Sequence, residues 1–312
     1  MTDVTGDYLA LRRDVAAVRV PCDVIRAFGP DSASFLQGQL SADVAGLRAG
    51  EWVWSLLLDP QGKLVAWVRV WGRLGEHELL LDVGDGAGQR VLDRLNRFRL
   101  RVHTELELLR WECVAVRGPA CPAPEDLDVR AELRAPVAWP GVGGVDLLGP
   151  AVEIPAGIHE AGPEAYESVR IECGWPAMGA EFPASGEPSV IPAETGQWFV
   201  DASVSFTKGC YTGQELVARV DSRGSNTPHR LRGLVVGSNV LPPVGAEVVV
   251  DGEVRGTLTS VGESLDLRAP VALGFVHRSV EPPAEVTLRW TTGDGDAHAE
   301  VPAQVRELPL VG

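Results

Sequence analysis

A tight turn, Asp59-Pro60-Gln61-Gly62, lies between two runs of leucine, β-branched and tryptophan residues at 53–58 and 64–71. Proline and glycine in such a turn are typical of a chain reversal between antiparallel strands. A third apolar run follows at 78–83, and the amphipathic stretch 87–100 predicts a helix after it. Because an isolated hairpin is at best marginally stable, these strands need a sheet with a covering helix. The pattern predicts an α+β fold.

Further elements are expected along the rest of the chain. Residues 23–28 are typical of a strand, and Asp31 is expected to cap a short helix that ends at Leu40. The stretch 119–163, rich in proline and glycine, predicts irregular strands and connections. Another helix is expected at 163–173, followed by a loop rich in glycine and proline.

Short strand-like runs separated by turn residues occupy the last part of the chain, for example at 234–236, 247–250 and 286–290. Their spacing is typical of a small β-barrel. The chain has 312 residues, which exceeds the roughly 250–300 residues at which a single core stops growing. We therefore expect two or three packed units, and if three, domains at 1–118, 119–229 and 230–312, of which the last is the barrel.

The formal net charge of −15 disfavours a stable complex with nucleic acid, because a phosphate backbone is bound through lysine and arginine. No apolar run approaches the roughly 20 residues that span a bilayer, and the first residues do not resemble a secretory leader. We therefore expect a cytoplasmic protein without a membrane partner.

The cysteines and histidines give no sign of a metal site or a disulfide framework. The five cysteines form no C-x-x-C pair, and the six histidines never occur at i, i+2 or i, i+4. We expect no bound metal and free thiols in a reducing compartment.

The segment K-G-C-Y-T-G-Q-E at 208–215 contains the residues best suited to chemistry. Thr212 and Glu215 match a capping box and predict that a helix starts near Thr212. Cys210 would then lie close to the positive end of a helix and to Lys208, which favours a reactive thiolate. Two simpler interpretations stay open: Thr212 and Glu215 act only as caps, and Cys210 is a small buried apolar residue.

The same eight residues resemble the signature of the YgfZ proteins, which belong to the glycine-cleavage T-protein (aminomethyltransferase) superfamily. Other segments resemble the family over most of the chain: F-L-Q-G-Q-L-S-A-D at 35–43, D-P-Q-G-K at 59–63, R-I-E-C-G at 170–174, G-T-L-T-S at 256–260 and A-L-G-F at 272–275.

This resemblance implies a three-domain aminomethyltransferase-like fold that binds tetrahydrofolate or a one-carbon derivative. It also implies a role in the assembly or repair of iron–sulfur enzymes, and through them in tRNA modification. Cys210 and Lys208 are then the predicted catalytic residues, and the predicted folate-binding residues are Glu172, Arg170, Tyr211 and Gln214.

Glu172 has a physical reason to bind a pterin, because one carboxylate can accept hydrogen bonds from a ring N–H and the adjacent amino group. In the aminomethyltransferase relatives a similar glutamate holds the pterin. The alternative is that Glu172 is a solvated helix residue paired with Arg170 or Lys208.

One departure from the relatives limits the predicted activity. Acidic residues of the enzymes that cleave glycine fall approximately on Ala66 and Trp67, so ordinary glycine cleavage is not expected. A different folate-dependent one-carbon transferase and a noncatalytic adaptor that holds a cluster through Cys210 remain alternatives, and the sequence leaves open whether the protein is an enzyme.

Nine tryptophans include Trp52 with Trp54 and Trp67 with Trp71. Two residues apart on a strand, Trp52 and Trp54 share a face. We expect them to pack in the core rather than to bind a ligand.

Overall fold

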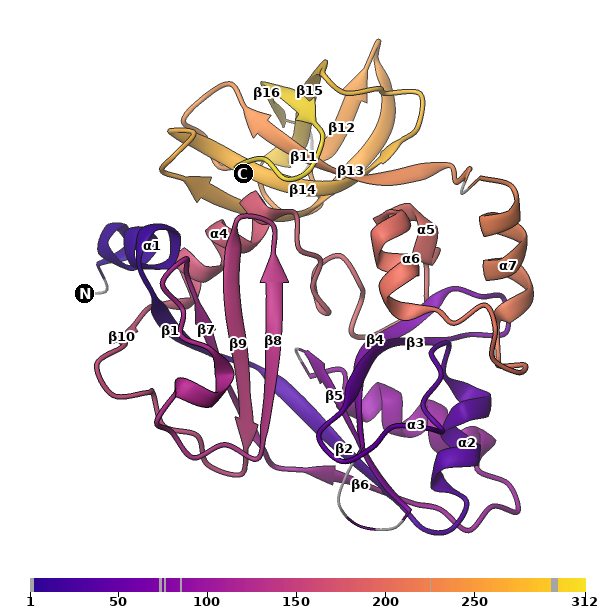
Figure 1. Ribbon diagram of the computed structural model, residues 1–312. Coiled ribbons are helices and arrows are strands. Elements are labelled where there is room, and N and C mark those ends of the chain that lie inside the picture. Colours follow the sequence, from indigo (N-terminus) through magenta and orange to yellow (C-terminus); the bar gives the residue numbers. More distant parts are fainter. Residues whose placement is uncertain (1–2, 73–74, 76, 85, 225, 293–296) are drawn as a thin grey trace. The chain divides into compact units, whose positions relative to one another are not determined.

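A computed structural model describes residues 3–72, 75, 77–84, 86–224, 226–292 and 297–312 (Figure 1). The chain forms two compact units, each built from separate stretches of sequence. We call them the barrel unit (Met1–Arg19, Cys113–Pro176 and Pro228–Gly312) and the hairpin unit (Val20–Glu112 and Ala177–Thr227). These units do not follow the three expected domain boundaries, and the division into three domains stays a prediction.

The hairpin unit contains an antiparallel five-stranded sheet in the order β3-β4-β5-β2-β6. Its strands are β2 (Cys22–Phe28), β3 (Trp52–Leu58), β4 (Leu64–Gly72), β5 (Glu78–Gly84) and β6 (Glu105–Leu109). Every residue of β4 is buried, which explains its largely apolar sequence, and its one charged residue, Arg69, pairs with Asp82 at 2.8 Å. The predicted turn is confirmed, since Gly62 N–H donates to the Asp59 carbonyl and Asp59 N–H to the Lys63 carbonyl, both at 2.9 Å.

Five helices accompany this sheet among the described residues: α2 (Ser32–Gln39), α3 (Gly88–Phe98), α5 (Pro192–Thr195), α6 (Gln197–Ser203) and α7 (Gln214–Ser222). Helix α3 is amphipathic and buries Val91 and Leu95, as its periodicity predicted. Asp31 is the N-cap of α2 but makes no capping hydrogen bond there, because one carboxylate oxygen accepts the His103 N–H at 2.7 Å. The short helices α5 and α6 were not predicted.

The barrel unit contains a five-stranded sheet in the order β10-β1-β7-β9-β8. Its strands are β1 (Ala16–Val20), β7 (Glu112–Arg117), β8 (Leu133–Trp139), β9 (Val142–Gly149) and β10 (His159–Glu160). Strands β8 and β9 form a regular antiparallel hairpin in the stretch expected to be irregular. Pro136 interrupts the sequence pattern of β8 but is tolerated because β8 is at the edge of the sheet.

The same unit includes the predicted C-terminal barrel. Its closed order is β11-β14-β13-β12-β15-β16, and its core contains Leu234, Val248, Leu288 and Val305. The strands are β11 (His229–Val236), β12 (Glu247–Val250), β13 (Glu253–Ser264), β14 (Ala269–His277), β15 (Ala284–Thr292) and β16 (Ala297–Arg306). The predicted α+β class with a C-terminal barrel is confirmed.

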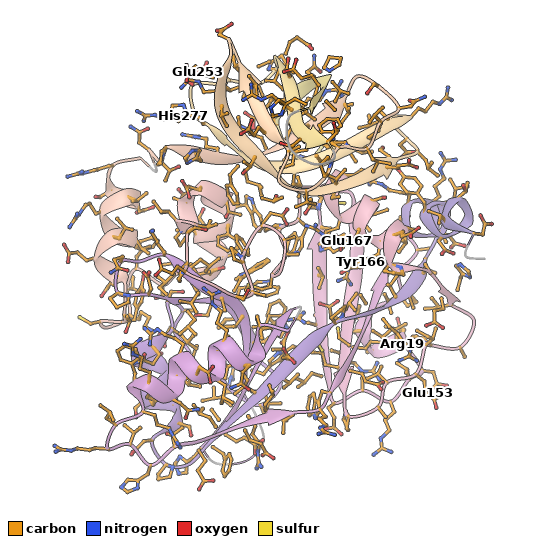
Figure 2. All side chains as sticks on the ribbon, turned by 180° about the vertical axis from the view of Figure 1, so that it is seen from behind. Arg19, Glu153, Tyr166, Glu167, Glu253 and His277 are labelled. Carbon is orange, nitrogen blue, oxygen red and sulfur yellow. The ribbon has the colours of Figure 1, made fainter. Side chains whose placement is uncertain are left out.

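Two helices of the barrel unit contact one another, α1 (Val4–Arg13) and α4 (Pro163–Cys173), and α4 also contacts β13 and β14. Figure 2 labels Tyr166 and Glu167 on α4. The Tyr166 ring lies 5.0 Å from that of Trp139, whereas Glu167 is exposed and pairs with Arg170 at 2.9 Å. Helix α4 therefore packs through one face and is solvated on another. In the described part of the chain no helix has the length and apolar character needed to span a membrane.

Candidate functional site

Lys208 attaches the 208–215 segment to the end of helix α2. Its ammonium donates to the main-chain carbonyls of Gln37 at 2.6 Å, Leu40 at 2.7 Å and Ala42 at 2.9 Å. The last carbonyls of a helix have no intrahelical partner and form the negative end of its dipole. One lysine therefore satisfies acceptors at and just beyond the end of α2.

The surroundings of Lys208 alter its titration and that of Tyr211. Burial lowers the pKa of Lys208 to about 8, although the nearby Asp43 acts in the opposite direction. The ammonium lies 5.2 Å from the centre of the Tyr211 ring, a cation–π contact. Burial raises the pKa of the Tyr211 phenol to about 12. At neutral pH the pair is a cation against a neutral phenol.

A second attachment joins the segment to the 59–63 turn. Gly213 has φ of +83°, and a Cβ there would lie 2.7 Å from the Asp59 carbonyl oxygen. A Cβ on Gly62, where φ is +75°, would lie 2.7 Å from the Cβ of Leu216. Thr212 N–H also donates to the Gly38 carbonyl at 3.2 Å. The segments 35–43, 59–63 and 208–215 thus form one local assembly, in which two contacts require glycine.

Two polar residues hold the 35–43 part of this assembly in shape. The Gln37 side-chain oxygen accepts the main-chain N–H groups of Val44 and Ala45, and its amide nitrogen donates to Asp43 at 3.0 Å. The Ser41 hydroxyl donates to the Ser203 carbonyl at 2.6 Å. Both residues lie in a segment that the sequence singled out, but their roles were not identified there.

Cys210 is exposed, whereas the other four cysteines are buried or half-buried. The predicted capping box is wrong: Gly213 is the N-cap of α7, no side chain caps the helix, and Glu215 instead pairs with Arg219. The helix begins at Gln214 rather than near Thr212. Cys210 is accordingly farther from the helix start than predicted, and the argument for its reactivity rests on exposure.

Tyr211 and Gln214 retain polar groups that a ligand could use. Gln214 is half-buried, and its side-chain amide makes no hydrogen bond to the residues that the structure describes. The phenol of Tyr211 likewise has no partner among them, and only 7% of the residue is exposed. An amide offers both donors and an acceptor, and a phenol offers one of each.

Glu172 and Arg170 belong to α4 in the barrel unit, where both are buried. One carboxylate oxygen of Glu172 accepts the Tyr8 hydroxyl at 2.5 Å, and the other lies 2.7 Å from Nε and 2.6 Å from Nη2 of Arg12. The interpretation of Glu172 as a solvated charge paired with Arg170 or Lys208 is therefore wrong. The carboxylate has no free edge for a pterin in this structure.

Arg170 is similarly engaged by the protein. Its guanidinium donates to the Glu167 carboxylate at 2.9 Å, the Trp175 carbonyl at 2.6 Å and the Ser260 hydroxyl at 2.6 Å. These contacts attach α4 to strand β13 and to the chain that follows the helix. Its geometry is that of a structural residue, and its part in folate binding stays a prediction.

Sequence reasoning missed Tyr8 and Arg12, the partners of Glu172. They are spaced i, i+4 on α1, so they share a helix face. That spacing was visible in the sequence, but nothing in it indicated contact with a residue more than 150 positions away. Burial and Glu172 together raise the pKa of Tyr8 to about 12, so its hydroxyl remains a donor at neutral pH.

Ala66 and Trp67, the positions on which the acidic residues of the relatives are expected to fall, are buried in β4. The Trp67 ring stacks on Trp54 with centroids 4.1 Å apart, and its indole N–H donates to the Ser203 hydroxyl at 3.1 Å. Trp71 is also buried, with 1% exposed. Trp52 and Trp54, which were expected in the core, contact one another with ring centroids 6.0 Å apart but are only half-buried, so that expectation is met in part.

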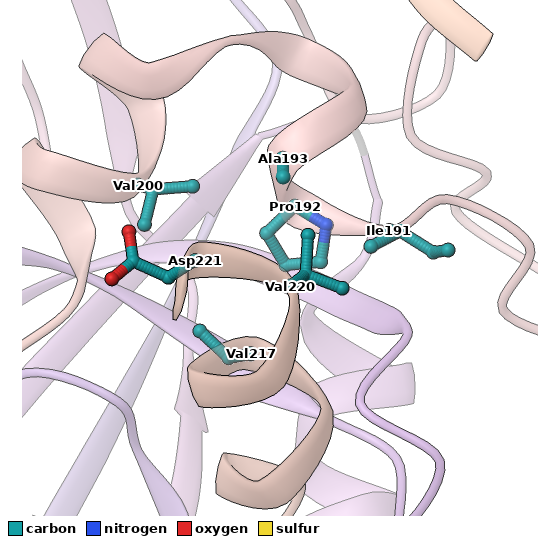
Figure 3. Close-up of a pocket in the computed structure, with 7 residues that line it drawn as sticks. All are labelled: Ile191, Pro192, Ala193, Val200, Val217, Val220 and Asp221. Carbon is teal, nitrogen blue, oxygen red and sulfur yellow. The ribbon is translucent and has the colours of Figure 1, made fainter. Parts of the chain in front are cut away.

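A small apolar pocket lies among α5, α6 and α7 (Figure 3), and its volume of about 10 Å³ leaves room for little more than one water molecule. Asp221 is the one ionisable residue among those that line it: Ile191, Pro192, Ala193, Val200, Val217, Val220 and Asp221. The pocket is too small to hold a pterin. In the described stretches, no group of three or more histidine, cysteine, aspartate or glutamate side chains is arranged to hold a metal ion.

The C-terminal part of the chain matches a known domain family. Residues 229–311 match the glycine cleavage T-protein C-terminal barrel domain. This range coincides with the closed barrel that begins at β11.

Curated proteins resemble a larger part of the chain. An aminomethyltransferase of Thermus thermophilus is 28% identical over 340 residues, which cover 99% of this chain and 91% of that protein. A tRNA-modifying protein YgfZ of Klebsiella pneumoniae is 29% identical over 223 residues, which cover 64% of this chain and 64% of that protein.

Among solved structures, the aminomethyltransferase T of the Bartonella henselae glycine cleavage system superposes with a TM-score of 0.77 at 20% identity. The superposition covers 99% of this chain and 89% of that one. The aminomethyltransferase-like fold is thereby confirmed.

Proposed function

The chain is a YgfZ-type member of the glycine-cleavage T-protein superfamily, and on that premise we propose that it binds a reduced folate and supports iron–sulfur enzymes that modify tRNA. The folate would be tetrahydrofolate or a one-carbon derivative. The role would be YgfZ-like rather than that of the aminomethyltransferase.

The observation that carries the proposal is the assembly of the 208–215 segment. Lys208 holds this segment on three carbonyls of the 35–43 segment, and Gly213 packs against the 59–63 turn. The residues that resemble the YgfZ signature are therefore constrained together instead of forming independent loops. Together these contacts hold the loop in place, and Cys210 is exposed on it.

The two predicted catalytic residues, Lys208 and Cys210, have different roles in this arrangement. Lys208 is a positioning residue, because all three of its hydrogen bonds go to main-chain oxygens. Cys210 is the residue that can meet a partner or substrate, because it is exposed at the surface. A thiol of this kind can attack an electrophile or form a mixed disulfide without rearrangement of the fold.

The four predicted folate-binding residues differ in whether their polar groups already have partners in the protein. Tyr211 and Gln214 have polar groups without partners among the described residues, so they can hydrogen-bond to a pterin or its glutamate tail. Glu172 and Arg170 would first have to lose partners within the protein. We therefore assign Tyr211 and Gln214 to the folate and a structural role to the other two.

A one-carbon transferase is the second candidate function, but the hairpin unit favours the adaptor. Transfer to an acceptor needs an acid or base beside the reacting group. The positions at which the aminomethyltransferase carboxylates are expected hold the buried Ala66 and Trp67, and Lys208 is occupied by carbonyls. Ordinary glycine cleavage is accordingly not part of the proposal.

Two measurements test the proposal separately. Calorimetric titration of the purified protein with tetrahydrofolate should show binding, and Gln214→Ala should weaken it by about five- to 150-fold if a hydrogen bond is lost. Absence of binding by the wild-type protein would remove the folate from the proposal.

The cellular role is tested in a bacterial strain that lacks its own YgfZ. The wild-type chain should restore the content of thiolated tRNA nucleosides, measured by mass spectrometry, and Cys210→Ser should not. Cys121→Ser is the matched control, because Cys121 is only half-exposed and lies outside the assembly. Full restoration by Cys210→Ser would exclude thiol chemistry as the mechanism.

A further inference from the structure

The stretch from helix α3 to strand β6 is strongly basic in an otherwise acidic chain. It contains five of the 28 basic residues: Arg90, Arg94, Arg97, Arg99 and Arg101. Asp93 is the single acidic residue between positions 89 and 103. Against the net charge of −15 for the whole chain, this is a local reversal of sign.

No carboxylate of the described residues forms an ion pair with these five guanidinium groups, although Asp59 lies close enough to Arg94 to stabilise its charge. Three of them donate to main-chain carbonyls instead: Arg90 to Pro183 at 3.0 Å, Arg94 to Leu58 at 3.0 Å and Arg99 to Thr104 at 2.6 Å. Carbonyl oxygens accept hydrogen bonds but leave the positive charge in place.

Arg97 and Arg101 are exposed, and neither makes a hydrogen bond or ion pair to the part of the chain that the structure describes. Asp93 lies i, i+4 from Arg97, yet its carboxylate accepts the Gln89 side-chain amide at 2.7 Å. Neither arginine therefore makes a charge-assisted hydrogen bond to a described residue.

Burial makes this concentration of charge unfavourable. It lowers the pKa of both Arg90 and Arg94; at Arg94 the Asp59 carboxylate acts in the opposite direction, and repulsion from Arg97 lowers the pKa further. The repulsion between Arg97 and Arg94 is the part of this cost that an anionic partner bound at Arg97 would reduce.

Exposed apolar side chains lie among the arginines. Leu100 is 77% exposed and Phe98 is 39% exposed. The Arg94 guanidinium lies 3.9 Å from the centre of the Phe98 ring. Aromatic and arginine side chains are the residue types enriched at the centres of protein interfaces.

Helix-end electrostatics explain part of this pattern but not all of it. Cations near the C-terminus of α3 are favoured by the helix dipole, which accounts for Arg97 and Arg99. The dipole gives no reason for a leucine to be exposed between two arginines. It also has little effect at Arg101, because the field decays within the last turn.

We propose that the surface formed by Arg97, Phe98, Leu100 and Arg101 docks a protein segment that presents carboxylates beside an apolar side chain. Charge complementarity selects the carboxylates, and Leu100 with Phe98 selects the apolar residue. An RNA strand would pair with the arginines but would leave Leu100 without an apolar partner. This surface lies outside the 208–215 assembly, so the inference goes beyond the proposed function.

The test uses a fluorescein-labelled helical peptide with a leucine stripe flanked by glutamates, titrated into the full-length protein by fluorescence anisotropy. A matched peptide with lysine in place of glutamate and a labelled single-stranded oligouridylate are measured in parallel. The acidic peptide should bind at least about tenfold more tightly than the lysine peptide, and added salt should weaken it.

Variants locate the binding on the protein. Arg97→Glu and Leu100→Ser should each weaken the acidic peptide by about five- to tenfold or more. Arg223→Glu is the matched control, because Arg223 is an exposed C-cap arginine of α7 without a partner among the described residues, and it should change nothing.

Three results would overturn the proposal: equal affinity for the two peptides, an unchanged affinity in Arg97→Glu, or an equal loss in Arg223→Glu. If the oligouridylate binds instead and Leu100→Ser has no effect, the arginines form a phosphate site and not a protein-docking surface. Thermal unfolding of each exposed variant shows that the fold is retained.

Discussion

The ammonium of Lys208 donates a hydrogen bond of 2.7 Å to the main-chain carbonyl of Leu40, the C-cap residue of α2. Nearly 170 positions separate these residues, yet each belongs to a segment that resembles the YgfZ family. The contact joins the two segments in the folded protein. Lys208 satisfies carbonyls that the end of α2 leaves without partners, and the end of α2 fixes the loop that exposes Cys210.

The buried position of Lys208 predicts a dependence of stability on pH. Its pKa falls from a usual 10.5 to about 8 in the folded protein, so the unfolded chain binds more protons between these values. The free energy of unfolding should therefore rise with pH from about 8 to 10.5 as far as Lys208 contributes. Lys208→Met lacks this group and should lack this part of the rise.

Urea unfolding of both proteins at several pH values measures this difference. Subtracting the Lys208→Met curve removes the contribution of other titrating groups to a first approximation. A wild-type advantage that is constant across the window would mean that the three carbonyls hold the pKa of Lys208 near its usual value.

Gly213 should not tolerate a side chain. Gly213→Ala places a Cβ 2.7 Å from the Asp59 carbonyl oxygen and also forces alanine to φ of +83°. The conformation costs about 1–2 kcal/mol and the overlap adds about 1–3 kcal/mol. Gly224→Ala separates the two effects, because φ there is +71° but no atom lies within 4 Å. Equal destabilisation of the two variants would show that the contact with the turn is not tight.

Glu172 should contribute more to folding than to ligand binding. Replacing it with glutamine leaves the buried Arg12 without its counter-ion, which costs about 3–5 kcal/mol. Glu215→Gln breaks an exposed i, i+4 pair with Arg219 and should cost only about 0.3–0.5 kcal/mol. Chemical denaturation measures both. A small loss of stability with a large loss of tetrahydrofolate affinity would return Glu172 to the pterin site.

Cys210 should be the first cysteine to react with iodoacetamide. It is exposed, whereas Cys113 and Cys173 are buried, and Cys22 and Cys121 are half-buried. Burial also raises the pKa of Cys121 and raises that of Cys173 to about 12, which keeps both thiols protonated near neutral pH. Peptide mass spectrometry after a brief pulse ranks the five sites. Faster labelling of Cys22 or Cys121 would show that the 208–215 loop is less accessible than the structure indicates.

Local sequence patterns determined most of the elements. The strands at 53–58, 64–71 and 78–83, the turn at 59–62 and the amphipathic helix α3 depend on neighbouring residues, and all are present. The capping-box pattern at Thr212 and Glu215 failed for a tertiary reason. Thr212 donates its N–H to Gly38, and Gly213 must approach Asp59, so the helix begins later.

The sequence by itself determined the α+β class, the closing barrel and the segment in which Cys210 lies, because periodicity, turn residues and short signatures are local properties. The tertiary structure alone decided what Lys208 in one unit and Glu172 in the other contact. Lys208 meets three carbonyls, and Glu172 meets Tyr8 and Arg12. Buried charges must find partners wherever folding brings them, and these partners come from more than 150 positions away along the chain.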